Sequence, residues 1–382
     1  MRFPEFSGEW DRIKVSDLLE FYPTNSLSWS QLEYSEEGVL NLHYGLIHKG
    51  LPTQVDVFEN SLPIIKEEFI PKKISLCLNG DVAFADASED TNDVAKCIEF
   101  ANCDGKKIVC GLHTIHGRDT QNKTVTGYKG YAFSAQAFRE QIRRLAQGTK
   151  IYSINSGNFS ECYIGIPSKV EQSKIANLLL AVDQRLAAQI KIIEDLKKLK
   201  SAIRAKVFKQ LESSCECWSE IGNMLQYEQP SKYLVASTEY SDSYATPVLT
   251  ANKAFILGYT DEEFGIYSKG ECVIFDDFTM DVKFVNFPFK VKSSAIKILT
   301  ANSGNDLYFV YEYLQNLGLV LEEHKRHYIS EIEPMIVACP TFEEQQNISN
   351  LLRSFDSKIE CANRELTLYN KQKQYLLSQM FI

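Results

Sequence analysis

Apolar residues recur at alternating spacings of three and four positions in two long segments of the chain. Such spacing aligns them on one side of an α-helix and is typical of a coiled-coil seam. A lysine interrupts the seam at the same place in both segments. The seam positions are Ile175, Leu179, Val182, Leu186, Gln189, Ile193, Leu196, Lys200, Ile203 and Val207 in the first segment, and Ile348, Leu352, Phe355, Ile359, Ala362, Leu366, Tyr369, Lys373, Leu376 and Met380 in the second.

The second segment is a copy of the first. Residues 164–208 and 337–381 align without a gap at an offset of 173, and eleven of the 45 aligned pairs are identical. Each copy begins with a proline and a capping box, Ser168 with Glu171 and Thr341 with Glu344. In such a box the hydroxyl and the carboxylate each accept a hydrogen bond from a backbone N–H at the helix start. The pattern predicts two long helices, the first about 63 Å long.

Each predicted helix has an apolar seam that needs a partner. One such stripe alone indicates a helix bundle or a dimerisation element. Two matched stripes in one chain can instead bury each other, and the long globular segment between them allows either direction. We expect an intramolecular antiparallel coiled coil, which would point two globular segments to opposite ends.

The two globular segments are weakly parallel in sequence. Each opens with a Trp-x-x-Ile pattern and has, near its end, an amphipathic helical run stopped by glycine, at Gly148 and Gly318. The predicted fold class is therefore α/β (mixed α+β), with globular segments and long helices alternating on a pseudo-two-fold plan. Short strand-like runs lie between these landmarks, at 107–110, 131–133, 271–275, 284–285 and 287–291.

The formal net charge of −9 hides a segregation of charge along the chain. Residues 106–150 hold nine basic and two acidic side chains, and residues 283–297 hold four basic and none acidic. A local basic surface can bind phosphate while the rest of the molecule stays acidic. From charge alone, a solvated face and a nucleic-acid surface are equally good interpretations.

The remaining composition narrows the class of protein. A chain of 382 residues predicts two or three domains. No run approaches the ~18 apolar residues of a membrane helix, and the start has no apolar signal region, so we expect a cytoplasmic protein with reduced thiols.

The tightest group of possible metal ligands is Cys103, Cys110, His113 and His116. Its irregular spacing favours a structural role, and we expect no metal site.

Two unlike globular segments on a rigid spacer suit a polymer that carries two unlike half-sites. One turn of duplex DNA is about 34 Å, so a spacer of the predicted length can set two readers into successive major grooves. The segments differ in size, with 157 residues separating Trp10 from Pro167 and 122 separating Trp218 from Pro340. The sequence therefore predicts recognition of an asymmetric split DNA sequence.

Several motifs together resemble the specificity subunit of type I restriction-modification enzymes. The repeated Pro-x3-Glu-Gln-x2-Ile helix starts at Pro167 and Pro340 resemble its conserved regions. Cys339 and Phe342 are departures, because an apolar and a polar residue are commoner there. The segments 108–115 and 146–150 resemble its first target recognition domain, and the segments 246–250, 275–279, 293–297 and 324–328 resemble its second.

The resemblance implies a domain plan and a set of partners. Residues 1–165 would be the first target recognition domain, 166–212 the central spacer helix, 213–338 the second target recognition domain and 339–382 the C-terminal spacer helix. The subunit would bind double-stranded DNA, two methyltransferase subunits and two restriction subunits, and no membrane. It would have no active site and no cofactor, because S-adenosylmethionine, ATP and magnesium serve the partners. In agreement, the sequence lacks a phosphate-binding loop, an adenine-flipping Pro-Pro motif and a G-x-G-x2-G motif.

Two other interpretations stay open. Asp276, Asp277 and Asp281-Val-Lys283 faintly resemble a nuclease metal site, although a strand-turn-strand is the simpler interpretation. The chain could also be a coiled-coil scaffold that binds only proteins. For DNA contacts, side-chain chemistry and the resembling segments select His113, Thr114, Arg118, Lys123, Lys150, Thr250, Lys253, Lys283, His324, Lys325 and Arg326.

Overall fold

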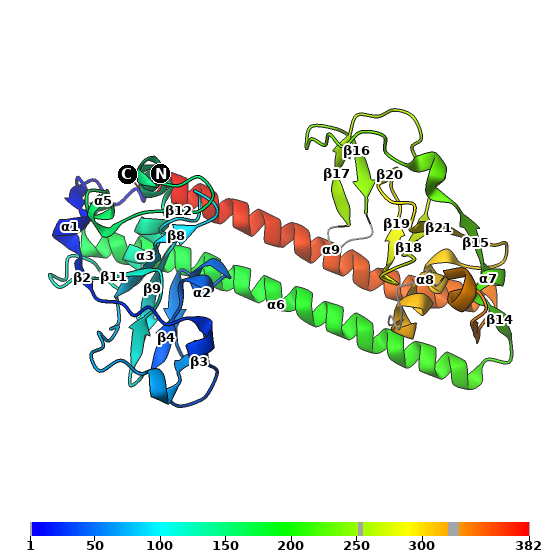
Figure 1. Cartoon of the computed structure of the whole chain (residues 1–382), viewed down its shortest axis with the longest axis horizontal. Coiled ribbons are helices and arrows are strands. Elements are labelled where there is room, and N and C mark those ends of the chain that lie inside the picture. The colour runs from blue at the N-terminus through cyan, green and yellow to red at the C-terminus, as the bar shows by residue number, and fades with distance from the viewer. Residues whose placement is uncertain (1, 251–254, 320–327, 382) are drawn as a thin grey trace. The chain divides into compact units, whose positions relative to one another are not determined.

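The computed structural model describes residues 2–250, 255–319 and 328–381. The chain divides into two compact units, and each is described by itself. Unit 1 comprises residues 1–191 and 364–382, and unit 2 comprises residues 192–363 (Figure 1). Each unit therefore contains one globular segment and one part of each of two long helices.

The long helices are α6 (Lys169–Ser214) and α9 (Phe342–Gln379), and both begin directly after the predicted capping residue. At α9 the capping box is complete. The backbone N–H of Thr341 donates to the Glu344 carboxylate at 2.9 Å, and the Glu344 N–H donates to the Thr341 hydroxyl at 3.4 Å. The helix α6 has 46 residues, which is about 69 Å and longer than the sequence predicted, because it continues through Ser214.

The first capping box is only half formed. The N–H of Glu171 donates to the Ser168 hydroxyl at 3.4 Å, as predicted. Its carboxylate, however, binds the guanidinium of Arg2 at 2.6 Å and the indole N–H of Trp10 at 3.3 Å. The box carboxylate of the first copy thus fastens the N-terminal segment to the helix instead of capping it.

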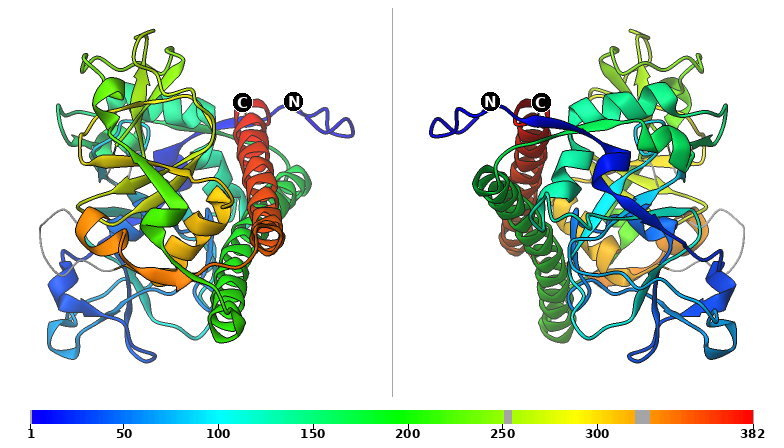
Figure 2. Two further views of the ribbon diagram at one scale, coloured as in Figure 1. Left: turned by 90° about the vertical axis from the view of Figure 1, so that its right-hand side faces the viewer. Right: turned by 90° about the vertical axis from the view of Figure 1, so that its left-hand side faces the viewer.

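Within unit 1, the first part of α6 packs against the last part of α9 (Figures 1 and 2). Leu179 is fully buried in this contact and Leu376 is 6% exposed. Removing such side chains from water stabilises the fold by about 1.5–3 kcal/mol each. The buried cluster joins Ile175, Leu179, Val182 and Leu186 of α6 to Leu376 of α9 and to Met380, which directly follows that helix.

Within unit 2, the rest of α6 packs against the start of α9. Phe208 and Leu352 are fully buried in one apolar cluster. Asp183 pairs with Lys373 in unit 1, whereas Lys200 pairs with Asp356 in unit 2. Partners of rising number along α6 therefore have falling numbers along α9. The two helices are antiparallel, which confirms the predicted coiled-coil fold class.

The globular part of unit 1 is built from short strands, five short α-helices and two 3-10 helices (Trp29–Gln31 and Glu67–Phe69). The α-helices are α1 (Val15–Leu18), α2 (Tyr44–His48), α3 (Tyr128–Ser134), α4 (Gln136–Leu145) and α5 (Ser156–Ser160). The strands are β1 (Asp11–Lys14), β2 (Glu20–Tyr22), β3 (Leu32–Glu33), β4 (Leu40–Leu42), β5 (Gln54–Asp56), β6 (Ile64–Ile65), β7 (Val82–Ala85), β8 (Ala87–Ser88), β9 (Cys97–Asn102), β10 (Ile108–Cys110), β11 (Thr114–Arg118), β12 (Tyr152–Ser153) and β13 (Tyr163–Ile166).

These strands form four sheets with the orders β1-β13, β10-β4-β6-β3, β2-β11-β7-β9-β5 and β12-β8. The inner strand β7 reads Val-Ala-Phe-Ala and is buried at every position, because α2 covers one of its faces and the cluster against α3 and α4 the other. The sheet β1-β13 ends immediately before α6 and so ties the globular part to the helix.

Unit 2 has the same kind of construction. Its short helices are α7 (Ile221–Met224) and α8 (Leu307–Leu317), and its strands are β14 (Trp218–Glu220), β15 (Leu225–Glu228), β16 (Thr246–Leu249), β17 (Ile256–Thr260), β18 (Cys272–Asp276), β19 (Val282–Val285), β20 (Lys290–Val291), β21 (Ile296–Ala301) and β22 (Ile336–Ala338). The sheet orders are β14-β22, β15-β21-β18-β19 and β17-β16-β20. As predicted, α8 ends at Gly318, whose φ of 58° suits a residue without a side chain.

One strand arrangement occurs in both units. The order β2-β11-β7-β9 in unit 1 matches β15-β21-β18-β19 in unit 2, because in each the last of the four strands lies between the first and the second. Each unit also has one antiparallel pair before its long helix, β1 with β13 and β14 with β22. Finally, each has one parallel pair outside the main sheet, β4 with β10 and β16 with β20. The repeat seen in the helices therefore extends to the globular parts.

One strand prediction is wrong. Residues 131–133 lie in helix α3, where Tyr131 is fully buried and donates its hydroxyl to Asp183 of α6 at 2.9 Å. Six of the seven α3 residues are buried, so the run carries no polar face. A short apolar run without such a face does not distinguish a helix from a strand. In the described part of the chain, no helix combines the length and the apolar character needed to span a bilayer.

Candidate nucleic-acid interface

The parallel strand pair of unit 1 brings two connecting segments together. The strands β4 and β10 run side by side, and the N–H of Gly111 donates to the Leu42 carbonyl at 2.9 Å. Beyond their carboxyl ends the chain continues as His43 and as the segment 111–113. Segments that leave parallel strands at one edge can carry recognition side chains, because the sheet fixes the positions where the segments begin.

The parallel pair of unit 2 repeats this arrangement. The N–H of Lys292 donates to the Leu249 carbonyl at 2.9 Å, as Gly111 does to Leu42. Thr250 follows β16, and the segment 292–294 follows β20. A second contact is also shared, because the N–H of Asp86 donates to the carbonyl of His113 and that of Asp277 to the carbonyl of Ala295. The two units therefore present different residues on one backbone plan.

Two cavities flank His113 in unit 1. A cavity of about 640 Å³ lies on one side and is lined by the segments 23–27 and 73–75, Pro71, Val109, Cys110, Leu112 and His113. A cavity of about 520 Å³ lies on the other side and is lined by Tyr44, Gly45, His48, Lys49, the segment 87–90, Asp93, His113 and Ile151. The first contains Lys73 with neutral hydrogen-bonding groups, whereas the second also holds three carboxylates. The first cavity is thus the better match for the edge of a base beside a phosphate.

His113 is held in a defined orientation. Its backbone has a φ of 54°, in the left-handed region that a residue with a side chain seldom adopts. Its Nδ1 lies 3.1 Å from the Asp86 carboxylate, and its ring meets the edge of Tyr44 with centroids 5.2 Å apart. The side chain is still 50% exposed. A fixed, half-exposed imidazole between two cavities can donate or accept a hydrogen bond at a ligand.

His43 has a different role from His113. It is buried, and its Nδ1 accepts the N–H of Gly45 at 3.1 Å at the start of α2. Burial lowers the pKa of His43, and the nearby His113 and Lys49 lower it further. The ring is therefore neutral at pH 7, and it supports Tyr44 and Trp29 by ring contacts.

The other predicted contacts in unit 1 lie in different surroundings. Thr114 is buried and donates its hydroxyl to the Gly111 carbonyl at 2.5 Å, so it shapes the segment that carries His113. Arg118 binds the carboxylate of Asp81 through two nitrogens at 2.8 and 2.7 Å. Lys123 donates to the Asp17 carbonyl at 3.1 Å. Lys150 is exposed and precedes Ile151, which lines the second cavity.

In unit 2, two of the predicted contact residues are described. Thr250 is 8% exposed, and its N–H donates to the Phe255 carbonyl at 3.0 Å. Lys283 lies in β19 with an exposed side chain. The other four predicted contacts, Lys253, His324, Lys325 and Arg326, lie outside the described residues.

The basic stretches 106–150 and 283–297 leave fewer free positive charges in the folded protein than their sequences suggest. Lys129 is buried against Glu99 at 3.1 Å, and Arg118 is paired with Asp81. In unit 2, Lys290 pairs with Glu262 at 2.7 Å and Lys297 with Asp277 at 3.2 Å, and both lysines are buried. Each of these cations is neutralised by a carboxylate inside the fold. Each pair therefore leaves one positive charge fewer at the surface to attract a phosphate.

The nuclease-like group forms a turn between two strands. Asp276 accepts the backbone N–H groups of Phe278 and Thr279 at 2.8 and 2.6 Å, which is the role of an aspartate in a tight turn. Asp277 accepts the N–H of Tyr328 at 2.9 Å besides pairing with Lys297. The turn joins β18 to β19, as the simpler interpretation predicted.

The seam residues predicted for the coiled coil lie inside the helices α6 and α9, and each side chain is buried or half-buried. The buried ones are Leu179, Val182, Leu186, Ile193, Leu352, Phe355 and Leu376, and the half-buried ones are Leu196, Ile203, Ile359, Leu366 and Tyr369.

Sequence reasoning missed several residues that line the two cavities. Asn25 donates its side-chain amide to Asn41 at 2.7 Å and lines the first cavity together with Lys73. Tyr44, His48 and Lys49 line the second. The run His43-Tyr44-x3-His48-Lys49 was the available signal, because aromatic and basic side chains gather there within one short helix. Because this run lies outside the basic stretches, counting charges along the sequence does not select it.

The chain is similar in sequence to specificity subunits of type I restriction enzymes. It is 42% identical over 176 residues to the type I restriction enzyme EcoR124I/EcoR124II specificity subunit of Escherichia coli. That match covers 43% of this chain and 44% of the relative, so it spans less than half of the relative's length. The putative type I restriction enzyme MjaX specificity subunit of Methanocaldococcus jannaschii is 23% identical over 353 residues, covering 82% of this chain and 80% of that protein.

The fold of the chain is also similar to that of a solved structure. The type I restriction-modification system S subunit from M. genitalium superposes with a TM-score of 0.59 at 16% identity, over 100% of this chain and 99% of that one. No family model matches the chain. Together the sequence and fold similarities confirm the predicted resemblance to type I specificity subunits and the predicted fold class.

Proposed function

We propose that the chain is the non-catalytic DNA-recognition subunit of a type I restriction-modification complex. One observation supports this most directly: the two units repeat one strand arrangement and present different side chains beyond its parallel strand pair. A duplicated scaffold with unlike recognition segments suits an asymmetric bipartite DNA site. Similarity to specificity subunits supports the same conclusion. In this proposal His113 and its two cavities read one half-site, and the segments after β16 and β20 read the other.

The surfaces of the long helices support the proposed protein partners. Several large apolar side chains on α6 and α9 are exposed although the seam buries others. They are Val170 (70%), Ile190 (47%), Ile192 (49%), Leu199 (49%), Leu351 (43%), Leu368 (63%) and Tyr375 (57%). Exposed apolar side chains on these helices are available for a partner protein to cover. We assign them to two methyltransferase subunits, with two restriction subunits completing the complex.

The proposal places all chemistry in the partners. S-adenosylmethionine, ATP and magnesium would be bound by the methyltransferase and restriction subunits. In this chain, two of the aspartates that resemble a nuclease site, Asp276 and Asp277, make turn and ion-pair contacts. We expect the complex to act on DNA in the cytoplasm.

A methylation map tests the proposed function. Adenine methylation would be compared across the host genome with and without the gene for this chain. The expected result is the loss of methylation at one split, asymmetric sequence. If no methylated sequence depends on the gene, and the chain still co-purifies with partner proteins, a coiled-coil scaffold that binds only proteins replaces this function.

A chimera tests the division of labour between the units. Residues 213–338 would be exchanged for the corresponding segment of another specificity subunit. Methylation should change in one half of the recognised sequence and stay unchanged in the other. A change in both halves would contradict independent recognition. The unexchanged protein in the same host is the matched control.

A further inference from the structure

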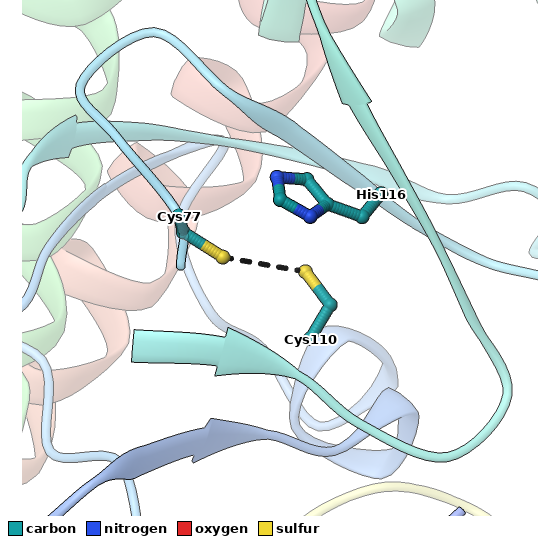
Figure 3. Close-up of side chains that lie close together, drawn as sticks. All are labelled: Cys77, Cys110 and His116. Atoms are coloured by element: carbon teal, nitrogen blue, oxygen red, sulfur yellow. Dashed lines mark hydrogen bonds between the residues drawn. The ribbon is translucent and has the colours of Figure 1, made fainter. Parts of the chain in front are cut away.

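Three side chains from distant parts of the sequence meet inside unit 1. They are Cys77, Cys110 at the end of β10, and His116 in β11 (Figure 3). One ligand atom of each lies within 4.8 Å of the others. Their exposed fractions are 3%, 1% and 0%, so the group is closed to solvent.

The two sulfur atoms have the spacing that a shared metal ion requires. The Sγ atoms of Cys77 and Cys110 are 3.6 Å apart. Two thiolates bound tetrahedrally at about 2.3 Å from a zinc ion are separated by about 3.8 Å. The pair is therefore nearly arranged for binding one ion.

The imidazole of His116 is held from behind by a carboxylate. Its Nε2 lies 2.8 Å from Oδ2 of Asp81, which Arg118 binds in turn at 2.7 Å. A carboxylate on the far nitrogen is the usual partner of a histidine that ligates zinc, because it fixes the ring and raises its basicity. The orientation of His116 is thus set before any ligand arrives.

The other nitrogen of His116 makes no well-formed hydrogen bond, although the Cys77 thiol lies near the ring. Nδ1 is among the buried polar atoms of the described residues that lack one. Leaving a buried polar atom unpaired costs about 1–3 kcal/mol. Figure 3 shows the ring beside the two sulfur atoms, where a bound cation would satisfy this nitrogen.

We propose that Cys77, Cys110 and His116 bind one zinc ion through two sulfur atoms and Nδ1. Both thiols release their protons to solvent when the ion binds, and no electron is transferred. The three side chains would fill three of the four positions around a tetrahedral ion. This set differs from the group weighed on sequence spacing, because Cys77 joins Cys110 and His116, whereas Cys103 and His113 do not belong to it.

The topology explains why the sequence did not reveal the site. The two cysteines are 33 residues apart, and they meet because Cys77 donates its N–H to the Ile108 carbonyl of β10 at 2.8 Å. His116 arrives on the next strand, β11. No metal-site motif carries this spacing, since the ligands come from three segments of the sheet region.

The ion would brace the candidate interface. The residues 73–75, just before Cys77, and 112–113, between Cys110 and His116, both line the cavity of about 640 Å³. Joining their bases through metal bonds would fix the cavity wall. The zinc site and the proposed DNA recognition are tested by different measurements, so either can fail without the other.

Metal content tests the inference on the full-length chain, purified with its partner proteins and without metal-affinity resin or chelator. We expect about one zinc ion per chain by elemental mass spectrometry. The variants Cys77→Ser, Cys110→Ser and His116→Gln should each lose it, whereas Cys162→Ser, a buried cysteine outside the cluster, should retain it. Wild-type protein without a stoichiometric metal, before and after incubation with zinc, would overturn the inference.

A second measurement does not depend on variants that fold. Wild-type protein treated with a chelator should show a lower melting temperature, and zinc should restore it. Cobalt added to the treated protein should give the strong visible bands of a tetrahedral thiolate complex. A disulfide between Cys77 and Cys110 in the freshly isolated protein, or cobalt bands that are absent, would contradict the site.

Discussion

Lys373 of α9 forms an ion pair with Asp183 of α6 at 2.6 Å, and each is the repeat counterpart of a residue in the equivalent pair of unit 2. There Lys200 of α6 pairs with Asp356 of α9, also at 2.6 Å. The lysine that interrupts each apolar seam thus meets the aspartate of the other copy. Asp183 also accepts the Tyr131 hydroxyl and Asp356 the Tyr308 hydroxyl, so each pair connects both helices to a globular part.

The two lysines should differ in their importance for stability. Lys200 also pairs at 2.6 Å with Glu312, which is fully buried, whereas Asp183 at the other pair is 13% exposed. Leaving a buried charge without a partner costs about 3–5 kcal/mol, and the cost is smaller where water reaches or where a second partner stays, as Arg204 does at 3.3 Å from Glu312. We expect Lys200→Met to lower the free energy of unfolding more than Lys373→Met, measured by urea denaturation. Lys191→Met, at an exposed position of α6, is the control, and equal losses at 200 and 373 would contradict the ranking.

The seam itself is tested with an aspartate at two positions of α9. Leu352 is fully buried and Leu368 is 63% exposed. An unpaired charge in an apolar contact costs several kcal/mol, about the cost of removing a buried leucine or more. Leu352→Asp should therefore lower the melting temperature strongly and reduce helicity by circular dichroism. Leu368→Asp should leave both nearly unchanged, and similar behaviour of the two variants would mean that the seam faces elsewhere.

Gly111 should be intolerant of a side chain. A Cβ there would lie 2.5 Å from Nδ2 of Asn41 and 3.0 Å from the Leu42 carbonyl. Asn41 is fully buried, so it cannot move aside freely. We expect Gly111→Ala to shift the segment that carries His113 and to weaken DNA binding at least tenfold in the assembled complex. Gly8→Ala, where a Cβ meets nothing within 4 Å, is the control. Unchanged affinity in Gly111→Ala would remove this segment from the interface.

Salt dependence separates free cations from paired ones. Each neutralised phosphate of B-DNA contributes about 0.9 to the slope of log K against log salt. Lys150 is exposed, so Lys150→Ala should reduce the slope by about one in the assembled complex. Arg118 is bound to Asp81, so Arg118→Ala should mainly lower thermal stability. The opposite outcome, a slope change at Arg118 alone, would mean that the arginine leaves Asp81 for the DNA.

The long helices were predictable because their information is local. A seam of alternating spacing and a capping box lie within consecutive residues, so Ser168 and Thr341 marked both starts correctly. The continuation of α6 to Ser214 was missed because polar residues near its end carry no seam. The run at Tyr131 was mistaken because burial on all sides erases the period by which helices and strands differ.

The candidate site was less predictable because it depends on contacts between distant segments. Counting charges along the chain cannot show that Glu99 lies against Lys129 or Glu262 against Lys290. Likewise, the cavity at Asn25 forms only when β2 and β10 have taken their places in separate sheets. His113 was found because it lies in a motif that the sequence itself displays.

Under the proposed function, the internal neutralisation of Lys129, Lys290 and Lys297 has a kinetic consequence. Non-specific adhesion grows with the number of free cations that face phosphate. A DNA-binding protein whose basic residues are partly paired inside its own fold dissociates quickly from non-cognate sequences. It therefore scans more sites in a given time, and its long residence is reserved for the sequence whose bases it contacts.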